Sequence, residues 1–211
     1  MKKKVFPAKY TPAAKGQFEP GSHKSVLKNK PGITSQSKMN DVEILAYREA
    51  AIKLAETFSQ DHSFNAADIQ KIHKTIFGNI YGWAGEYRNV ELARGEFVFA
   101  RAIYIPDLMN RFSRKILERN TPPNVRNKKA LAKLLAKIHV ELILIHPFRE
   151  GNGRTVRLLL HLIAQQAGFA GMDFSNIDQK GKSFDAYITA IHKGMSKKYD
   201  PMATILTDAI I

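Results

Sequence analysis

"KKALAKLLAKIHVELILIHPFREGNGRTVRLLLHLIAQQAGF", residues 128–169, contains two strongly apolar segments separated by a short polar one. Leucine and isoleucine recur at helical spacing between Leu131 and Ile145, and Pro147 ends this first segment. The second segment begins near Gly153 and ends at Gly168. Both are apolar enough to be buried on most sides, so the sequence predicts a helical core interrupted by one polar loop.

Helical patterns also flank this pair of segments. They predict helices at residues 40–59, 65–80, 106–120, 183–195 and 200–210. Asn40 and Asn65 are the expected N-caps of the first two helices, and Glu43 would complete a capping box with Asn40. The residues expected to face inward are Ile44, Tyr47, Ala51, Leu54, Ala55 and Phe58 in the first helix, and Ile69, Ile72 and Ile76 in the second.

One segment departs from the helical pattern. "NVEL" at 89–92 and "FVFA" at 97–100 are short β-like runs, which predict a small hairpin with residues 93–96 as its connection and Gly95 in the turn. The predicted fold class is therefore all-α with one small β-hairpin.

The first 38 residues have a different composition from the rest. They are rich in Lys, Pro, Gly, Ser and Thr and show no sustained periodicity, which favours an extended arm that packs at a few points. The expected organisation is an arm at 1–38 and one helical domain at 39–211.

The composition restricts the chemistry. The 211 residues include no cysteine, which excludes disulfides, thiolate zinc sites and a cysteine nucleophile, and favours a cytoplasmic protein. No apolar run reaches the length of a membrane span. The formal net charge of +14 attracts anions in general, whether nucleic acid, acidic lipid, nucleotide or acidic protein, and equally suits mere solubility.

The polar loop "HPFREGNG" at 146–153 precedes a helix N-terminus, where backbone N–H groups lack intrahelical partners and the helix dipole is positive. Gly151 and Gly153 allow a ligand to approach the main chain closely. Arg154 and Arg157 are three residues apart and share a helix face. These features indicate a cradle for an oligophosphate.

Two further residues of the loop suggest what such a cradle would do. Glu150 would repel phosphate unless a cation lay between them, and Mg²⁺ binds through one or two carboxylates together with phosphate oxygens. His146 carries an imidazole that can accept a proton near neutral pH. Each feature alone is more often structural, but their combination between two apolar helices favours nucleotide-triphosphate chemistry.

The loop and the first turn of the following helix resemble the signature of the Fic family, H-x-F-x-[D/E]-G-N-G-R-x-x-R, at all of its specified positions. "IYGWAGEYR" at 80–88 also resembles the family's upstream segment, "VLKNKPGIT" at 26–34 resembles what often precedes the core in bacterial members, and the hairpin occupies the position of the family's flap. The resemblance covers about residues 25–200 and implies the Fic helical bundle.

The resemblance implies AMP transfer from Mg-ATP to a hydroxyl side chain of a target protein. His146 would be the general base and Glu150 the Mg²⁺ ligand. A lysine at the position of Gly153 marks kinase-like relatives, so the glycine favours attack at the α-phosphate. The resemblance also implies an anion hole at Gly151, Asn152 and Gly153, and phosphate binding by Arg154 and Arg157. Phe148 would have a structural role. The hairpin would be a flap that aligns the target segment, formed by Gly95, Glu96, Phe97, Val98 and Phe99. Tyr187 is expected near the adenine.

Regulation is suggested by a missing motif. Many Fic proteins are inhibited by a helix bearing [S/T]-x-x-x-E-[G/N], whose Glu pairs with the second arginine, yet the only Glu followed by Gly or Asn here is Glu150. The resemblance then implies a separate small antitoxin that supplies a Glu to Arg157, a chain without restraint, or a shortened chain. It leaves open whether the protein acts in its own cell or is delivered into another.

Three rival functions remain at this point. The same scaffold could transfer UMP or phosphate, it could bind a nucleotide or protein without turnover, or the basic chain could bind nucleic acid. The complete motif argues against a non-catalytic module, and no nucleic-acid reader motif accompanies the positive charge.

Overall fold

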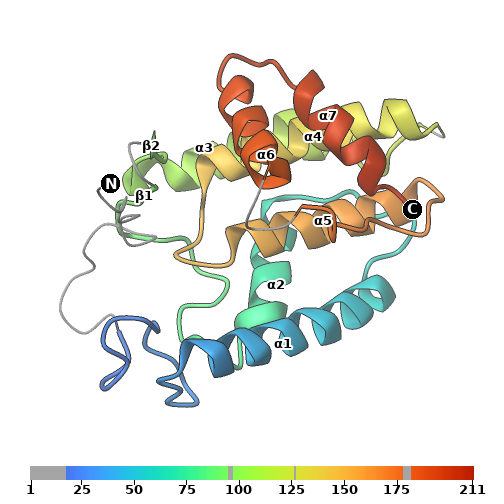
Figure 1. The fold of residues 1–211 in the computed structure, drawn as a ribbon. Coiled ribbons are helices and arrows are strands. Elements are labelled where there is room, and N and C mark those ends of the chain that lie inside the picture. The colour runs from blue at the N-terminus through green and yellow to red at the C-terminus, as the bar shows by residue number, and fades with distance from the viewer. Residues whose placement is uncertain (1–17, 95–96, 126, 178–181) are drawn as a thin grey trace.

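The computed structural model describes residues 18–94, 97–125, 127–177 and 182–211, and it confirms an all-α fold with one small hairpin (Figure 1). A π-helical turn at Ser113–Leu117 continues α3, and a 3-10 turn at Ala102–Tyr104 precedes it. The helices are α1 (Gln36–Thr57), α2 (Ala66–Phe77), α3 (Ile105–Phe112), α4 (Lys128–Ile145), α5 (Asn152–Gln166), α6 (Lys182–Gly194) and α7 (Asp200–Ala209).

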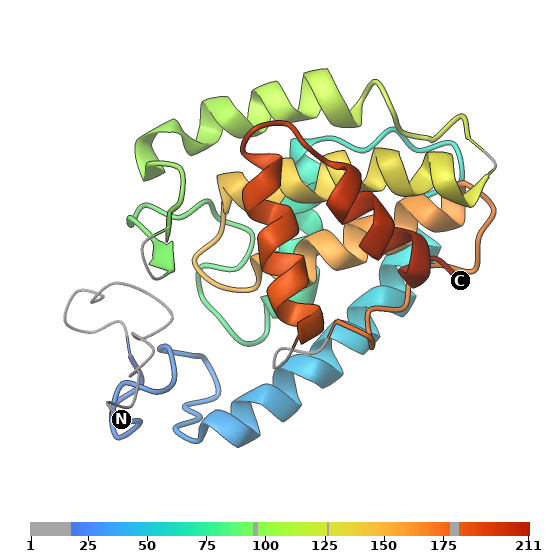
Figure 2. The same cartoon turned by 45° about the horizontal axis from the view of Figure 1, so that its top comes forward.

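The two apolar segments form α4 and α5, which pack against each other in the middle of the molecule. α1 and α2 cover α5 on one side, and α6 and α7 cover α4 on the other (Figures 1 and 2). Ten residues of α4 are buried, among them His139. This placement explains the apolar composition: both helices have neighbours on most sides, and burial of apolar area is the main favourable term in folding.

The helix expected at 40–59 starts earlier than predicted. Ser35 caps α1 by accepting a hydrogen bond from the N–H of Lys38 at 3.4 Å, so Asn40 lies inside the helix and the predicted capping box is wrong. Of the predicted inward face, Leu54 is buried and Tyr47 half-buried, whereas Ile44 is 50% exposed. The buried face instead includes Glu43, a charged residue that an apolar pattern does not register.

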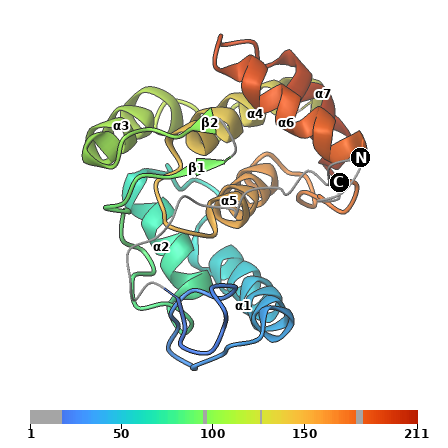
Figure 3. The same ribbon diagram turned by 60° about the vertical axis from the view of Figure 1, so that its left-hand side comes forward.

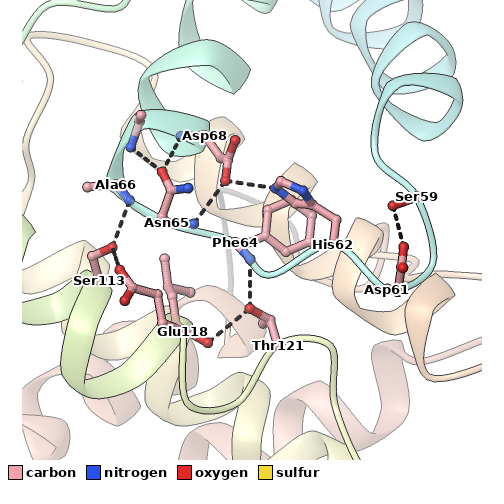
Figure 4. Close-up of polar contacts among 12 residues, drawn as sticks. Ser59, Asp61, His62, Phe64, Asn65, Ala66, Asp68, Ser113, Glu118 and Thr121 are labelled. Atoms are coloured by element: carbon pink, nitrogen blue, oxygen red, sulfur yellow. Dashed lines mark hydrogen bonds and ion pairs between the residues drawn. The ribbon is translucent and has the colours of Figure 1, made fainter.

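The predicted start of α2 is confirmed (Figure 4). The Asn65 side chain accepts from the N–H of Asp68 at 3.2 Å, and the Asp68 carboxylate accepts from the N–H of Asn65 at 2.9 Å, a complete capping box. The N–H groups on either side of Asn65 donate to the hydroxyl oxygens of Thr121 at 2.8 Å and Ser113 at 3.0 Å. These bonds anchor α2 to the segment after α3.

The hairpin forms with its second strand inside the predicted run 97–100, but its first strand follows the predicted run 89–92. β1 (Ala93–Arg94) pairs antiparallel with β2 (Phe97–Val98), so residues 93 and 94 belong to a strand and not to the connection. One further bond, from the N–H of Phe99 to the carbonyl of Leu92 at 3.1 Å, continues the ladder. Gly95 and Glu96, expected in the turn, lie outside the described residues.

The hairpin lies beside the connection between α4 and α5 (Figure 3). That connection, 146–151, is the polar loop identified in the sequence, so the fold brings the β-hairpin and the loop together at one end of the two central helices. None of the described helices is both long and apolar enough to cross a membrane.

Candidate active site

His146 directly follows α4 and adopts a left-handed backbone conformation, with φ 53°, which is uncommon outside glycine. Its ring Nδ1 lies 3.1 Å from the carbonyl oxygen of Ile143. Because a carbonyl can only accept, the neutral ring carries its proton on Nδ1 and its basic lone pair on Nε2. The ring stacks on Phe99, with centroids 3.7 Å apart. The imidazole is thus oriented by α4 on one side and by the hairpin segment on the other.

The loop after His146 is fixed by its own side chains. Asn152 accepts from the N–H of Phe148 at 2.8 Å and donates to the carbonyl of Phe148 at 2.7 Å. The Asn152 side chain is therefore used by hydrogen bonds within the loop, so only the main chain of Asn152 could bind an anion. Phe148 is fully buried and its ring stacks on that of His73, with the ring centroids 3.9 Å apart.

His73 of α2 holds the main chain of the loop. Its Nδ1 accepts the N–H of Gly85 at 2.9 Å, so its Nε2 carries the proton and donates to the carbonyl of Glu150 at 3.0 Å. Burial lowers the pKa of His73 to about 4, which keeps the ring neutral. The ring thereby joins α2, the segment 80–88 and the loop.

Glu150 and Gly151 form the turn into α5. The Glu150 carboxylate accepts from the N–H of Gly151 at 3.0 Å and lies 3.6 Å from Nη2 of Arg154. Gly151 has φ +78°, and a Cβ built on it would lie 2.3 Å from the ring of Phe77. Both the backbone angle and the space therefore require glycine at position 151.

Gly153 provides a matched control for Gly151. No atom lies within 4 Å of a Cβ built on Gly153, and its φ is not positive. We expect Gly151→Ala to lower the free energy of unfolding by about 2 kcal/mol or more, through clash and backbone strain, and Gly153→Ala to leave it unchanged. Urea denaturation of the two variants checks this, and equal effects would contradict the packing described here.

Arg154 lies between two carboxylates. Its Nη1 donates to Glu43 of α1 at 2.8 Å, and its guanidinium stacks over Phe77 at 4.8 Å. The hydroxyl of Tyr81 donates to the other oxygen of Glu43 at 2.8 Å. No role at the site was predicted for Glu43 from the sequence. The only available signal was a charged residue within the apolar pattern of a helix.

Arg157 has a different environment. Its guanidinium lies over the rings of Phe174, at 5.3 Å, and Tyr187, at 5.9 Å, while its buried Nε has no hydrogen-bond partner among the described residues. Tyr187 is 5% exposed, and its hydroxyl lies 3.0 Å from Nε2 of His139. Tyr187 thus packs against the second arginine, and its expected proximity to adenine stays a prediction.

The described flap residues differ in exposure. Phe99 is buried against His146, Phe97 stacks on His192 at 5.6 Å, and Val98 is 65% exposed. An edge strand with an exposed residue can pair with an extended peptide through its main chain. The hairpin therefore places such an edge beside the His146 ring.

Arg88 is a further residue of the site to which the sequence assigned no role. Its side chain is fully buried and donates to three carbonyl groups, those of His146 at 2.8 Å, Val90 at 2.6 Å and Ala100. Its own N–H donates to the carbonyl of Pro147 at 2.8 Å. One guanidinium therefore connects the His146 loop to both sides of the hairpin.

A magnesium ion is compatible with the side chains at this site. The described residues contain no group of three or more His, Cys, Asp or Glu that could hold a metal ion. Mg²⁺ in nucleotide sites does not need such a group, because one or two carboxylates and the phosphates themselves supply its ligands. Glu150 directly precedes the N-terminus of α5 and is the carboxylate that could serve as such a ligand.

The two buried histidines make stability depend on pH. Burial lowers the pKa of His73 to about 4 and that of His139 to about 3, against about 6.5 in an unfolded chain. Between pH 6.5 and about 4 the unfolded chain binds more protons, so the free energy of unfolding falls as the pH falls, by about 1.4 kcal/mol per pH unit for each histidine. Urea denaturation at pH 7.0, 6.0, 5.0 and 4.5 checks this.

A His23→Gln variant is the matched control for the pH series, because His23 is exposed. It should show the same pH dependence as the parent chain. A free energy of unfolding that stays constant from pH 7.0 to 4.5 would contradict two buried neutral histidines.

Comparison with known proteins agrees with the motif and the fold. Residues 63–164 match the family model described as Fic/DOC family. A "Probable protein adenylyltransferase y4lH" of Sinorhizobium fredii is 29% identical over 87% of this chain and 90% of its own length. "Protein adenylyltransferase VbhT" of Bartonella schoenbuchensis is 30% identical over 74% of this chain, which spans only 32% of that protein.

Solved structures show the same fold. BepC of Bartonella tribocorum, a structure with bound AMPPNP, has a TM-score of 0.73 at 24% identity, covering 92% of this chain and 96% of that one. The motif from His146 to Arg157 lies entirely within the family match, and the helices that position it share the arrangement of these structures. Residues 63–164 of the chain therefore form a domain of the Fic/DOC family.

Proposed function

We propose that this protein transfers AMP from Mg-ATP to a hydroxyl group of a target protein. The observation that carries the proposal is the geometry of His146, whose Nε2 is the basic nitrogen and whose ring is held between the end of α4 and Phe99 of the hairpin segment. The names of the relatives, which are protein adenylyltransferases, support the same activity.

In the proposed reaction, the target hydroxyl oxygen attacks the α-phosphorus of ATP. Nε2 of His146 takes the hydroxyl proton, the new bond joins the target oxygen to the α-phosphorus, and the bond to the bridging oxygen breaks so that pyrophosphate leaves. The main-chain N–H groups at the start of α5, with Arg154 and Arg157, would stabilise the charge on the phosphates. Gly153, with open space around it, leaves room for them.

Glu150 would hold Mg²⁺, which when bound neutralises phosphate charge. The hairpin edge at Phe97–Val98 would align the target segment by main-chain pairing, beside the ring of His146. The arm at 1–38 and the domain at 39–211 are the proposed division of the chain.

The surroundings of Arg157 support the further proposal that a separate antitoxin regulates the protein. In the part of the chain that the structure describes, its buried Nε has no hydrogen-bond partner, and the ring contacts to Phe174 and Tyr187 supply no carboxylate. A glutamate from a small helical partner could pair with this guanidinium and displace the outermost phosphate. Purification with such a partner, and its loss on Arg157→Ala, is the test of this part of the proposal.

The test of the activity is incubation of a bacterial lysate with the protein and ATP labelled at the α-phosphate. Label on a protein band supports AMP transfer. Label that arrives only from the γ-phosphate indicates a kinase-like reaction instead, and label from UTP indicates UMP transfer. If the protein binds nucleotide tightly but no protein band is labelled, the result would indicate a module that binds nucleotide without transferring a group.

A further inference from the structure

Glu43 is the residue of the site whose chemistry is least explained by the reaction. It lies on α1, 111 positions before Arg154 in the chain, and is only 6% exposed. Burying a carboxylate is costly unless it is paired and hydrogen-bonded. Both of its oxygens are occupied, one by Nη1 of Arg154 and the other by the hydroxyl of Tyr81, each at 2.8 Å.

The pair is not symmetric with respect to solvent. The side chain of Glu43 is 7% exposed, whereas that of Arg154 is 28% exposed. The carboxylate is therefore the more deeply buried partner, and the guanidinium is the more accessible one. Phe77 supports one face of that guanidinium at 4.8 Å. Glu43 and Phe77 together therefore hold Arg154 in its observed position.

A second carboxylate competes for the same arginine. Glu150 lies 3.6 Å from Nη2 of Arg154, against 2.8 Å from Nη1 to Glu43. If Glu43 lost its charge, Glu150 would become the main charged partner of Arg154. The arginine would then turn toward the residue proposed to hold Mg²⁺, and both groups would be less available to a nucleotide.

We infer that Glu43 is a positioning residue that holds Arg154 ready for a phosphate and keeps it from closing on Glu150. This inference rests on the proposed function and deepens it, because it names what orients one of the two phosphate-binding arginines. It also differs from inhibition by a glutamate on the second arginine, since the contact is with the first and the carboxylate is buried.

Two effects of removing the charge oppose each other, so the sign of the result is informative. Neutralising Glu43 makes the site more positive by one charge, which by itself attracts ATP. It also frees a long side chain whose rotamers must be fixed again on binding, and it lets Arg154 pair with Glu150. If Glu43 positions Arg154, the second effect dominates and affinity falls. If Glu43 obstructs the site, affinity rises.

The experiment measures the dissociation constant of AMPPNP with Mg²⁺ by calorimetry for the parent chain, Glu43→Gln, Tyr81→Phe, Arg154→Ala and the double variant Glu43→Gln/Arg154→Ala. We expect Glu43→Gln to weaken binding about tenfold, the scale of one charge-assisted contact. Tyr81→Phe should weaken it less and in the same direction. The double variant should bind no more weakly than Arg154→Ala alone.

The control is Glu49→Gln, on the exposed part of the same helix, which should bind like the parent chain. Equal or tighter binding by Glu43→Gln overturns the inference, as does a further loss on adding Glu43→Gln to Arg154→Ala. If Glu43→Gln does not fold, Tyr81→Phe gives the same comparison with one hydroxyl removed, and parent-like binding by it then overturns the inference.

The inference and the proposed function fail in different ways. A parent chain that binds AMPPNP and labels no protein refutes the transfer activity while the Glu43 comparison still stands. A parent chain that labels protein, with binding unchanged in Glu43→Gln, refutes only the role of Glu43. A parent chain that binds no nucleotide refutes both.

Discussion

His146→Ala should abolish labelling of the target while leaving nucleotide binding nearly unchanged. The ring Nδ1 is used by the carbonyl of Ile143, so only Nε2 can take the proton of the target hydroxyl. Loss of a general base typically costs a hundredfold to ten-thousandfold in rate, roughly. The phosphates would meet the start of α5 and its arginines, which this substitution does not touch. Quantitative labelling and AMPPNP calorimetry on the same samples measure both effects.

His139→Gln is a suitable comparison for this variant, because His139 is a buried histidine of α4 that contacts Tyr187 and not the loop. It should lower stability and keep measurable transfer. Transfer at the parental rate by His146→Ala would refute the proposed base. Loss of AMPPNP binding in that variant would mean that the ring supports the cradle as well.

The central helices could be predicted because burial on most sides leaves a strong apolar periodicity. α4 and α5 have such surroundings, and their shared loop carries a motif with fixed spacing, so the sequence alone predicts the two core helices and the position of the loop from His146 to Gly153 between them. The cap of α2 was equally clear, since Asn65 and Asp68 are local partners within one turn.

The start of α1 was mispredicted for a physical reason. Ser35 and Asn40 are both good N-cap residues, and the choice between them depends on where the preceding chain runs, which a local pattern does not encode. The inward face was wrong in part because Glu43 is buried for its contact with Arg154, a partner 111 residues away.

The residues that pair in the hairpin could also not be predicted from the local sequence pattern. The two β-like runs at 89–92 and 97–100 were identified, yet the paired strands are Ala93–Arg94 and Phe97–Val98. Arg88 explains the difference. It donates to the carbonyls of Val90 and Ala100, and so fixes the residues on both sides of the hairpin by a side chain instead of by ladder bonds.

Arg88→Ala is accordingly expected to have the second large effect. It would leave the carbonyls of His146, Val90 and Ala100 without their shared donor, and buried unsatisfied groups cost about 1–3 kcal/mol each. We expect the free energy of unfolding to fall by about 3 kcal/mol or more, a total below the sum because such losses are not additive. Arg88→Lys should recover only part, since an ammonium group cannot match a planar fork of donors.

The effect on transfer distinguishes this role from a loss of stability alone. Displacement of His146 and of the hairpin by about 1 Å would reduce the rate on the order of a hundredfold. Below the melting temperature, Arg88→Lys should therefore lower kcat and raise KM for the target while KM for ATP stays near the parental value, because Asn152 fixes the phosphate loop separately. Arg111→Lys, on an exposed arginine, is the control. Parental kcat in Arg88→Lys, or a rise in KM for ATP alone, would show that the guanidinium does not position the base and the flap.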